Sequence, residues 1–558
     1  MFLDFERATD VPFAPDICVV GAGIAGLTLV SALRQRGLKI LVLEGGGLIH
    51  EPRCQSLFET EIDFADAVNL GVANGRFRVF GGSGTRWSGA LIPLAAQELP
   101  ARSTIDRVGW PIDHAMLAPY FNRLETMLGL EGTPFDASCY RVAGRTTPTL
   151  AADFDTLSVR FSKTLPWRKR DIGRFLGPSL NKDPDVVVLY HANAVELVRG
   201  ERLDVVTGIR VRSYTGREQI FAAREFIIAA GAIESVRLLL VSHSLHPDGM
   251  ADQWKLLGCG FMDHVVLRAG VVVTADACSR LRQIARAFYI GNVLHTPRFE
   301  LTQQTQAEEE CLSGYANIFF EAPPESAFVK LRTALRDYQA CGVRALSRGP
   351  YWALMRGTPD LVGGFFAWSV LGLKPISGRS TPTVSLVAEQ PSRSDARIRM
   401  AGDHDAVGMP RLALAWQIGD AELRTLTVVG RRLEALLRRS QIGAVTWFDE
   451  AFDPKEGARP DRVADQYHHA GGARMSASAR DGVVDANCRV HDMQNLYLAS
   501  AAVFPSSGCS NPTFTIMALA LRLAEHLRAL GHQRSTAQTP HVRRLRLRFR
   551  KRTRNMTS

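Results

Sequence analysis

The chain has 558 residues, 46% of them hydrophobic and 22% charged, which are the proportions of an ordinary soluble globular protein. Its length exceeds one simple core and predicts two closely joined domains. Residues 362–373 form the longest apolar run, too short to cross a bilayer, and no signal-peptide pattern opens the chain, so a cytoplasmic location is expected.

The nine cysteines and the net charge of +11 exclude several kinds of site. The cysteines form no Cys-x-x-Cys pair, so we predict no metal centre and no disulfide framework. Eight of the basic residues lie between His541 and Ser558, which leaves +3 for the rest. We expect residues 533–558 to be a disordered tail, solvated or in weak contact with a membrane or partner, and no nucleic-acid binding by the chain as a whole.

The N-terminal part of the chain has the pattern of a strand, helix and strand. Residues 17–20 predict a buried parallel strand, residues 24–36 a helix and residues 39–43 a second strand. Three further short strands and a helix are predicted later in the first half of the chain, at 186–190, 195–198 and 226–230 for the strands and 234–240 for the helix.

Alternating stretches at 267–273 and 397–400, with a helix predicted over 420–439, indicate an antiparallel sheet with helices. Short apolar strand character returns at 495–498, before a last helix over 515–530. We therefore predict an α/β fold, α+β overall, in which a Rossmann-like cofactor domain is interrupted by a substrate domain. The predicted cofactor segments are 1–110, 180–262 and 460–532, and the substrate segments are 111–179 and 263–459.

A glycine-rich turn follows the first strand directly. Gly21, Gly23 and Gly26 would permit a tight turn, approach of a pyrophosphate to backbone amides, and close packing of helix on strand. Glu44, at the end of the second strand, would accept hydrogen bonds from a ribose. The motif predicts a dinucleotide, and its position with Gly45 after the acid favours FAD.

A second glycine-rich loop spans residues 78–89 and suits backbone packing against a flat aromatic ring system. A flexible linker is the alternative, and the tryptophan within the loop argues against it. The candidate cofactor residues of this loop are Gly81, Gly82, Ser83, Thr85, Arg86, Trp87 and Ser88.

Two segments near the end carry the candidate catalytic residues. His468 lies in the glycine-rich stretch 467–475, and Asn511 lies 43 residues later in the stretch 507–515, ahead of an apolar helix. Combined with the dinucleotide motif, this pair predicts a flavin enzyme that oxidises an alcohol.

With these motifs, the chain resembles the glucose–methanol–choline (GMC) oxidoreductase family from about residue 15 to residue 530. The resemblance implies that His468 takes the hydroxyl proton while a hydride moves to flavin N5, and that Asn511 orients the alcohol. His469 would pack or contact the flavin. The resemblance further implies FAD contacts at Ala25, Ala194, Val195, Ala230, Gly231, Ser500, Ala501, Asn511, Pro512 and Thr513.

Two positions depart from the family pattern. Some members carry a flavin-linking histidine where this chain has Arg86, so noncovalent FAD is predicted. Many members have aspartate where this chain has Ser500, which changes contacts to the ribityl or pyrophosphate groups.

We expect the substrate to be a sugar, polyol or aminocyclitol-type alcohol, with oxygen or another acceptor taking the electrons. One alternative is an NAD(P)H-using flavin monooxygenase, which would call for a second nucleotide motif. Another is a flavoprotein subunit docked on a membrane or partner through the basic tail. The aromatic segments 351–355 and 365–368 indicate an entry wall or, more simply, core packing.

Overall fold

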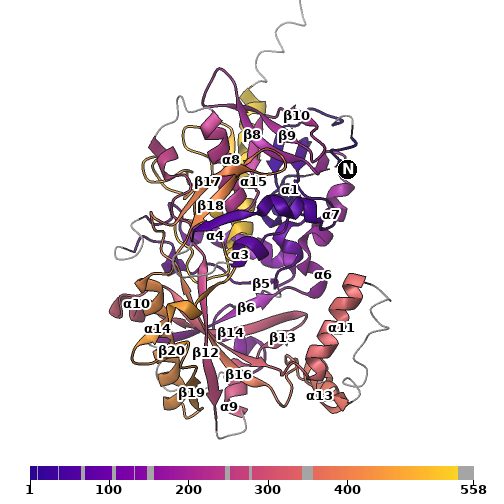
Figure 1. Cartoon of the computed structure of the whole chain (residues 1–558). Coiled ribbons are helices and arrows are strands. Elements are labelled where there is room, and N and C mark those ends of the chain that lie inside the picture. The colour runs from indigo at the N-terminus through magenta and orange to yellow at the C-terminus, as the bar shows by residue number, and fades with distance from the viewer. Residues whose placement is uncertain are drawn as a thin grey trace, which may run out of the picture.

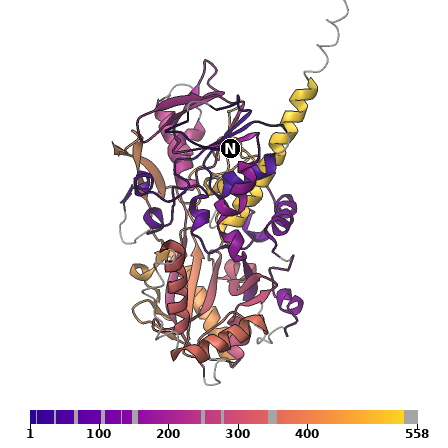
Figure 2. The ribbon, with the colours of Figure 1, turned by 90° about the vertical axis from the view of Figure 1, so that its right-hand side faces the viewer.

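A computed structural model describes residues 1–8, 11–34, 37–63, 70–102, 108–130, 132–146, 156–245, 252–274, 279–341 and 356–537. The molecule is elongated, with a parallel sheet and its helices in one half and a large antiparallel sheet in the other (Figures 1 and 2).

Six parallel strands form the core of the first half. Four of them, including the strand of residues 17–20, are buried throughout, as expected for a parallel sheet covered on both faces. Their order across the sheet is β1 (Phe2–Asp4), β7 (Val186–Tyr190), β3 (Ile40–Leu43), β2 (Ile17–Val20), β11 (Glu225–Ile228) and β23 (Leu496–Leu498).

Helices of distant sequence pack together against this sheet. Helix α1 (Ile24–Leu33) contacts both α7 (Ile172–Asn181) and the last helix α15 (Pro512–Ala537), and α4 (His114–Leu128) also contacts α15. Helix α8 (Ala232–Leu245) contacts the antiparallel sheet of β8 (Asn193–Arg199), β9 (Val206–Arg212) and β10 (Glu218–Phe221).

The second half is built on nine antiparallel strands. The amphipathic helix α14 (Asp420–Arg439) covers part of this sheet and buries Leu426, Val429, Leu433 and Leu437. The strands run in the order β19 (Ala444–Trp447), β12 (His264–Val273), β16 (Thr381–Glu389), β15 (Gly314–Glu321), β14 (Val293–Leu301), β6 (Leu157–Thr164) and β5 (Ala90–Leu91), with β13 (Phe288–Ile290) on β14 and β22 (Ala464–Asp465) on β12.

A smaller sheet and several short elements complete the described chain. In the small sheet, β17 (Arg397–His404) pairs with β18 (Pro410–Ala415), which pairs with β4 (Thr60–Asp63); β17 also contacts α8. The remaining helices are α2 (Pro52–Gln55), α3 (Leu70–Asn74), α5 (Ser138–Val142), α6 (Trp167–Arg170), α9 (Ser279–Ala285), α10 (Gln303–Glu308), α11 (Ala327–Cys341) and α13 (Thr358–Ser369). The 3-10 turns are η1 (Ser56–Phe58), η2 (Gly82–Thr85), η3 (Ala96–Glu98), η5 (Asp252–Leu256), η7 (Pro460–Arg462) and η8 (Ala501–Val503), and β20 (Phe452–Asp453) pairs with β21 (Gly457–Ala458).

The predicted mixed fold is confirmed, and the helix predicted over 420–439 has the same bounds in α14. The last helix is longer than predicted and continues to Ala537, past the start of the predicted tail, most of which lies outside the described residues. Core packing was the wrong prediction for Phe365, Phe366 and Trp368, which are exposed, while segment 351–355 lies outside the described residues. In the described part of the chain, no helix combines the length and apolar character needed to cross a membrane.

Candidate active site

A large hollow lies at the carboxyl ends of the parallel strands, where dinucleotide sites of such sheets are found. It holds about 1420 Å³ of space, part of it open to solvent, and is lined from both ends of the sequence, by the turn after β2, the end of β3 and the start of α15.

Glycines shape the floor of this hollow. A side chain at Gly26 would place its Cβ 2.0 Å from the carbonyl oxygen of Gly21, so helix and turn touch directly. Gly21 itself has φ +101° and is confined by the backbone of Ala229. Gly23, in contrast, faces open space, because no atom of the described residues lies within 4 Å of where a Cβ would stand. The turn is therefore closed by protein on one side and free for a ligand on the other.

The second glycine loop packs directly on the first. The amide of Gly81 donates to the carbonyl of Ala22 at 2.8 Å, and a Cβ on Gly82 would lie 3.1 Å from the Cα of Gly23. Gly81 and Gly82 both have positive φ, of +95° and +55°. The two loops thus form one continuous backbone surface along the hollow.

Glu44 is buried at the end of β3 and braces this surface. One carboxylate oxygen accepts from the amide of Ala22 at 2.8 Å and the other from Gly46 at 2.7 Å. Burial raises the pKa of Glu44, while those two hydrogen bonds oppose the rise. Each oxygen keeps a second lone pair for a ribose hydroxyl.

The predicted cofactor residues fall into two groups. Those that line the hollow are Gly21, Gly23, Ala25, Glu44, Gly45, Gly82, Ser83, Ala194, Ala230, Gly231, Ser500, Ala501, Pro512 and Thr513. Those outside its lining are Gly26, Gly81, Thr85, Arg86, Trp87, Ser88, Val195 and Asn511.

Contacts with other residues hold the side chains of Arg86 and Trp87 away from the hollow. The guanidinium of Arg86 is 4.9 Å from the ring centroid of Phe77, and its side chain is exposed. The indole nitrogen of Trp87 donates to the carbonyl of Arg170 at 2.6 Å, which turns the ring towards α6. Neither side chain therefore lines the hollow.

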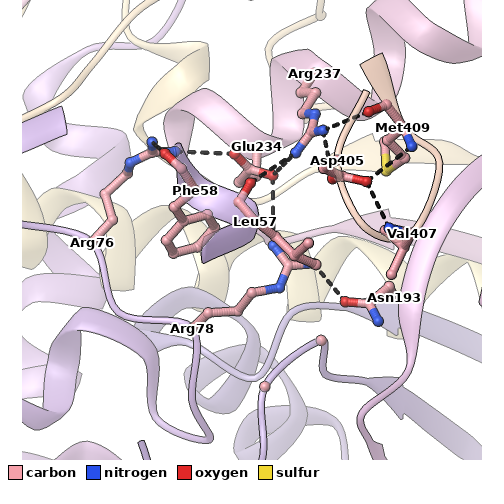
Figure 3. A network of polar contacts seen from close by, with 12 residues as sticks. Leu57, Phe58, Arg76, Arg78, Asn193, Glu234, Arg237, Asp405, Val407 and Met409 are labelled. Carbon is pink, nitrogen blue, oxygen red and sulfur yellow. Dashed lines mark hydrogen bonds and ion pairs between the residues drawn. The ribbon is translucent and has the colours of Figure 1, made fainter. Parts of the chain in front are cut away.

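A buried charge network forms one wall of the hollow (Figure 3). Glu234, in the first turn of α8, accepts from Arg76 at 3.0 Å and lies 3.6 Å from Arg78. Arg237 contacts the same carboxylate at 3.3 Å and Asp405 at 2.7 Å. Of this network, Arg76, Arg78 and Glu234 face the hollow, where the charge of Glu44 also acts on Arg78. The two guanidinium groups offer N–H donors that suit an anionic ligand.

His468 also lines the hollow and is held through its backbone. Its amide donates to Asp263 Oδ1 at 2.8 Å, and the same oxygen accepts from the amide of His264 at 2.7 Å. Burial, followed by the carboxylate of Asp465, raises the pKa of Asp263 to about 8. One carboxyl oxygen thus fixes both histidines relative to each other.

The hydrogen bonds of His264 determine which nitrogen of His468 is bare. The carbonyl of Gly508 only accepts, so His264 Nε2, at 2.7 Å, donates to it. His264 Nδ1 then carries a lone pair and accepts from His468 Nδ1, at 2.8 Å. His468 Nε2 is left without a proton, and the amide nitrogen of Asn511 lies 3.2 Å away and donates to it.

Both rings are neutral near pH 7, as this assignment requires. Burial is the main cause that lowers the pKa of His264 to about 4. Burial, followed by His264, His469 and Arg298, lowers the pKa of His468 well below its ordinary value. His469 lines the hollow, with Nε2 3.6 Å from Asp263 Oδ2, and burial followed by Arg76 lowers its pKa to about 3.

Asn511 immediately precedes α15, so its amide, the bare nitrogen of His468 and the helix N-terminus converge. Pro512 and Thr513 carry this helix end to the hollow, where its free amides favour negative charge. Ser500 is buried, and its hydroxyl accepts from the amide of Ala502 at 3.3 Å, which caps the turn that follows β23.

Sequence reasoning did not single out His264 or Asp263 for the site, nor Arg76 and Glu234 for the wall. His264 begins a strand of the antiparallel sheet, 204 residues before His468, so no local spacing links the two. Only the folded chain brings them together.

The comparisons with known proteins agree with this geometry. Residues 392–520 match the family model of the GMC oxidoreductases. The chain is 23% identical to paromamine 6'-oxidase of Streptomyces fradiae, over 94% of this chain and 93% of that protein, and 23% identical to 6'''-hydroxyparomomycin C oxidase of Streptomyces lividus, over 92% of each. Its fold is similar to that of formate oxidase, with a TM-score of 0.56 and 17% identity over 94% of this chain and 100% of that chain. The matched segment contains both His468 and Asn511, and in it the chain is similar to the GMC oxidoreductases, whose members act on CH–OH donors.

Proposed function

We propose that this enzyme binds FAD noncovalently and oxidises the CH–OH group of a sugar, polyol or aminocyclitol-type alcohol. His468 is the general base and Asn511 orients the alcohol oxygen. The observation that carries the proposal is the bare Nε2 of His468, presented beside Asn511 at the end of a hollow built on a dinucleotide turn.

The chain's own groups account for the proton. The alcohol replaces the direct hydrogen bond between His468 Nε2 and Asn511 Nδ2, which are 3.2 Å apart before substrate binds, as the two side chains move apart. The hydroxyl donates to Nε2, and the amide of Asn511 donates to the alcohol oxygen. As the C–H bond breaks, the hydroxyl proton moves to Nε2 and the new positive charge on the ring is shared through Nδ1–H with His264.

FAD, when bound, supplies the flavin N5 that accepts the hydride. The glycine turn at Gly21 and Gly23 suits the pyrophosphate, and Glu44 suits the adenosine ribose. The N-terminal amides of α15 suit negative charge on the reduced ring. Noncovalent attachment is supported by Arg86, because a guanidinium is no nucleophile and this one is directed over Phe77.

The substrate class rests on the relatives. Two enzymes that match over more than nine tenths of this chain are oxidases named for paromamine and for 6'''-hydroxyparomomycin C. We infer that this chain also takes a polyhydroxylated, amino-bearing or sugar-like alcohol.

The test is anaerobic bleaching of the flavin absorbance across a panel of amino sugars, sugars and simple diols, followed by admission of oxygen. We expect the sugar-like alcohols to bleach the wild-type enzyme and His404→Ala, an exposed control. His468→Ala should keep FAD and lose bleaching by roughly 10² to 10⁴-fold. Bleaching of His468→Ala at the wild-type rate would refute the role of the base.

Acid precipitation tests the attachment separately. We expect all yellow colour in the supernatant, and flavin retained in the pellet would show a covalent bond.

A further inference from the structure

Helix α13 and the two residues that follow it present an unusual face to solvent. Within ten residues, six large apolar side chains are exposed by about half or more, whereas a soluble surface carries such residues singly. These six residues, the apolar face, are Val362 (62%), Phe365 (63%), Phe366 (54%), Trp368 (49%), Val370 (64%) and Leu371 (49%).

The burial pattern of helix α13 is the reverse of that of an ordinary surface helix, which buries its large apolar residues. The small residues Gly364 and Ala367 of α13 are buried, and a Cβ on Gly364 would lie 2.3 Å from the ring of Phe328 in α11. Small residues therefore allow α11 and α13 to approach closely, while the large apolar residues point away from the protein. The rings of Phe365 and Trp368 contact each other, with centroids 5.9 Å apart, on that outer side.

The two helices form a pair at the periphery of the molecule. In both views they lie at the end opposite to the one where α15 leaves the body (Figures 1 and 2). Helix α6 carries another exposed aromatic residue, Trp167 (65%), and its Arg170 acts on Lys374 together with Arg332 of α11.

Cations surround the base of this pair. Partial desolvation, followed by the guanidinium groups of Arg332 and Arg170, lowers the pKa of Lys374, whose side chain still reaches solvent. Arg145 donates to the carbonyl of Leu371 at 2.8 Å, beside the apolar face. Like charges close enough to disturb one another create a positive field that suits an anionic surface.

We propose that the apolar face docks the enzyme on an anionic lipid bilayer. Helix α13 lies in the interfacial plane, with its phenylalanines and valine among the acyl chains and Trp368 at the level of the headgroups. Arg170, Arg332 and Lys374 contact the phosphate groups. This arrangement anchors the protein without crossing the membrane, and it uses a surface distinct from the basic C-terminal segment.

Sedimentation with vesicles tests the proposal on the full-length protein. The vesicles are phosphatidylcholine alone and phosphatidylcholine mixed with phosphatidylglycerol. We expect binding to the mixed vesicles, and a double variant, Phe365→Ser with Trp368→Ser, to lose at least roughly tenfold in binding because two rings no longer leave water. Ile220→Ser removes an exposed apolar residue on β10 (46%) and should bind like the wild type.

Two further measurements separate the apolar face from its competitors. A chain ending at Ala537 should still bind in a Trp368-dependent way, with a blue-shifted emission on vesicles that is absent from Trp368→Phe. Equal binding by the double variant, or loss of all binding on removal of residues 538–558, would overturn the proposal. So would absence of vesicle binding together with a dimer that the double variant dissociates, because a second copy would then cover the face.

Discussion

Replacing His264 by leucine should slow proton transfer from the substrate to His468, although His264 itself contacts neither substrate nor cofactor in the proposed mechanism. The change removes the acceptor of the His468 Nδ1–H, which is buried, and a buried donor without a partner costs about 1–3 kcal/mol. Without this acceptor, the tautomer of His468 that carries its proton on Nδ1 is no longer favoured. The tautomer with the proton on Nε2, which cannot act as the base, then becomes populated. A penalty of that size reduces the population of the competent base, and with it the rate of flavin reduction, by roughly 5 to 160-fold.

The matched variant is His264→Asn, whose side-chain oxygen stands near the position of Nδ1 and still accepts from His468. Stopped-flow reduction of the flavin under anaerobic conditions measures both variants, with flavin content and circular dichroism as controls for folding. We expect the leucine variant to lose kcat with little change in KM, and the asparagine variant to recover most of it. The reasoning fails if both variants lose activity equally, or if the leucine variant stays within about twofold of wild type.

Three more outcomes follow from the same geometry. Gly23→Ala should fold with an unchanged Tm, because its Cβ meets no atom of the described residues, but it should bind FAD weakly. Gly26→Ala should lose both stability and FAD, because its Cβ would lie 2.0 Å from the carbonyl oxygen of Gly21. Thermal melts with and without FAD measure both variants. Glu234→Ala leaves buried guanidinium groups without their carboxylate and should destabilise the protein by about 3–5 kcal/mol, read from the shift of the urea midpoint. The pKa of the His264 side chain is about 4 in the folded protein and an ordinary 6.5 in the unfolded chain. Between pH 6.5 and pH 4 the unfolded chain therefore binds a proton at this side chain that the folded protein does not bind. The free energy of unfolding consequently falls as the pH drops through that range. This group alone should remove about 2 kcal/mol between pH 7 and pH 5, and the fall of Tm over that interval should be smaller in His264→Asn.

The sequence was most informative where local pattern decides structure. The parallel strand over 17–20 and the helix over 420–439 were predicted with their observed bounds, because continuous burial and a 3.6-residue stripe are local signals. His468 was found because it stands in a glycine-rich segment and Asn511 because it stands just before an apolar helix, and the resemblance to the GMC family chose His468 over His469. The structure brings His468 and Asn511 within hydrogen-bonding distance.

What could not be predicted depends on contacts between distant segments. His264 is an ordinary strand residue by pattern, and only the pairing of sheet and turn makes it the partner of His468. The aromatic run at 365–368 has the composition of a core segment, and its exposure arises because Gly364 and Ala367 take the inner face of the helix. Composition alone does not say which side of a helix faces the protein.

The single oxygen of Asp263 that holds the amides of both histidines also constrains how substrate enters. His264 belongs to the antiparallel sheet, whereas Asn511 leads into a helix that packs on the parallel-sheet side. A hinge motion that separated the two halves would break the hydrogen-bonded chain that runs from Gly508 through His264 and His468 to Asn511. The tautomer of His468 would then no longer be fixed. We therefore expect alcohol and product to exchange through local movement of surface segments, without a hinge motion between the two halves.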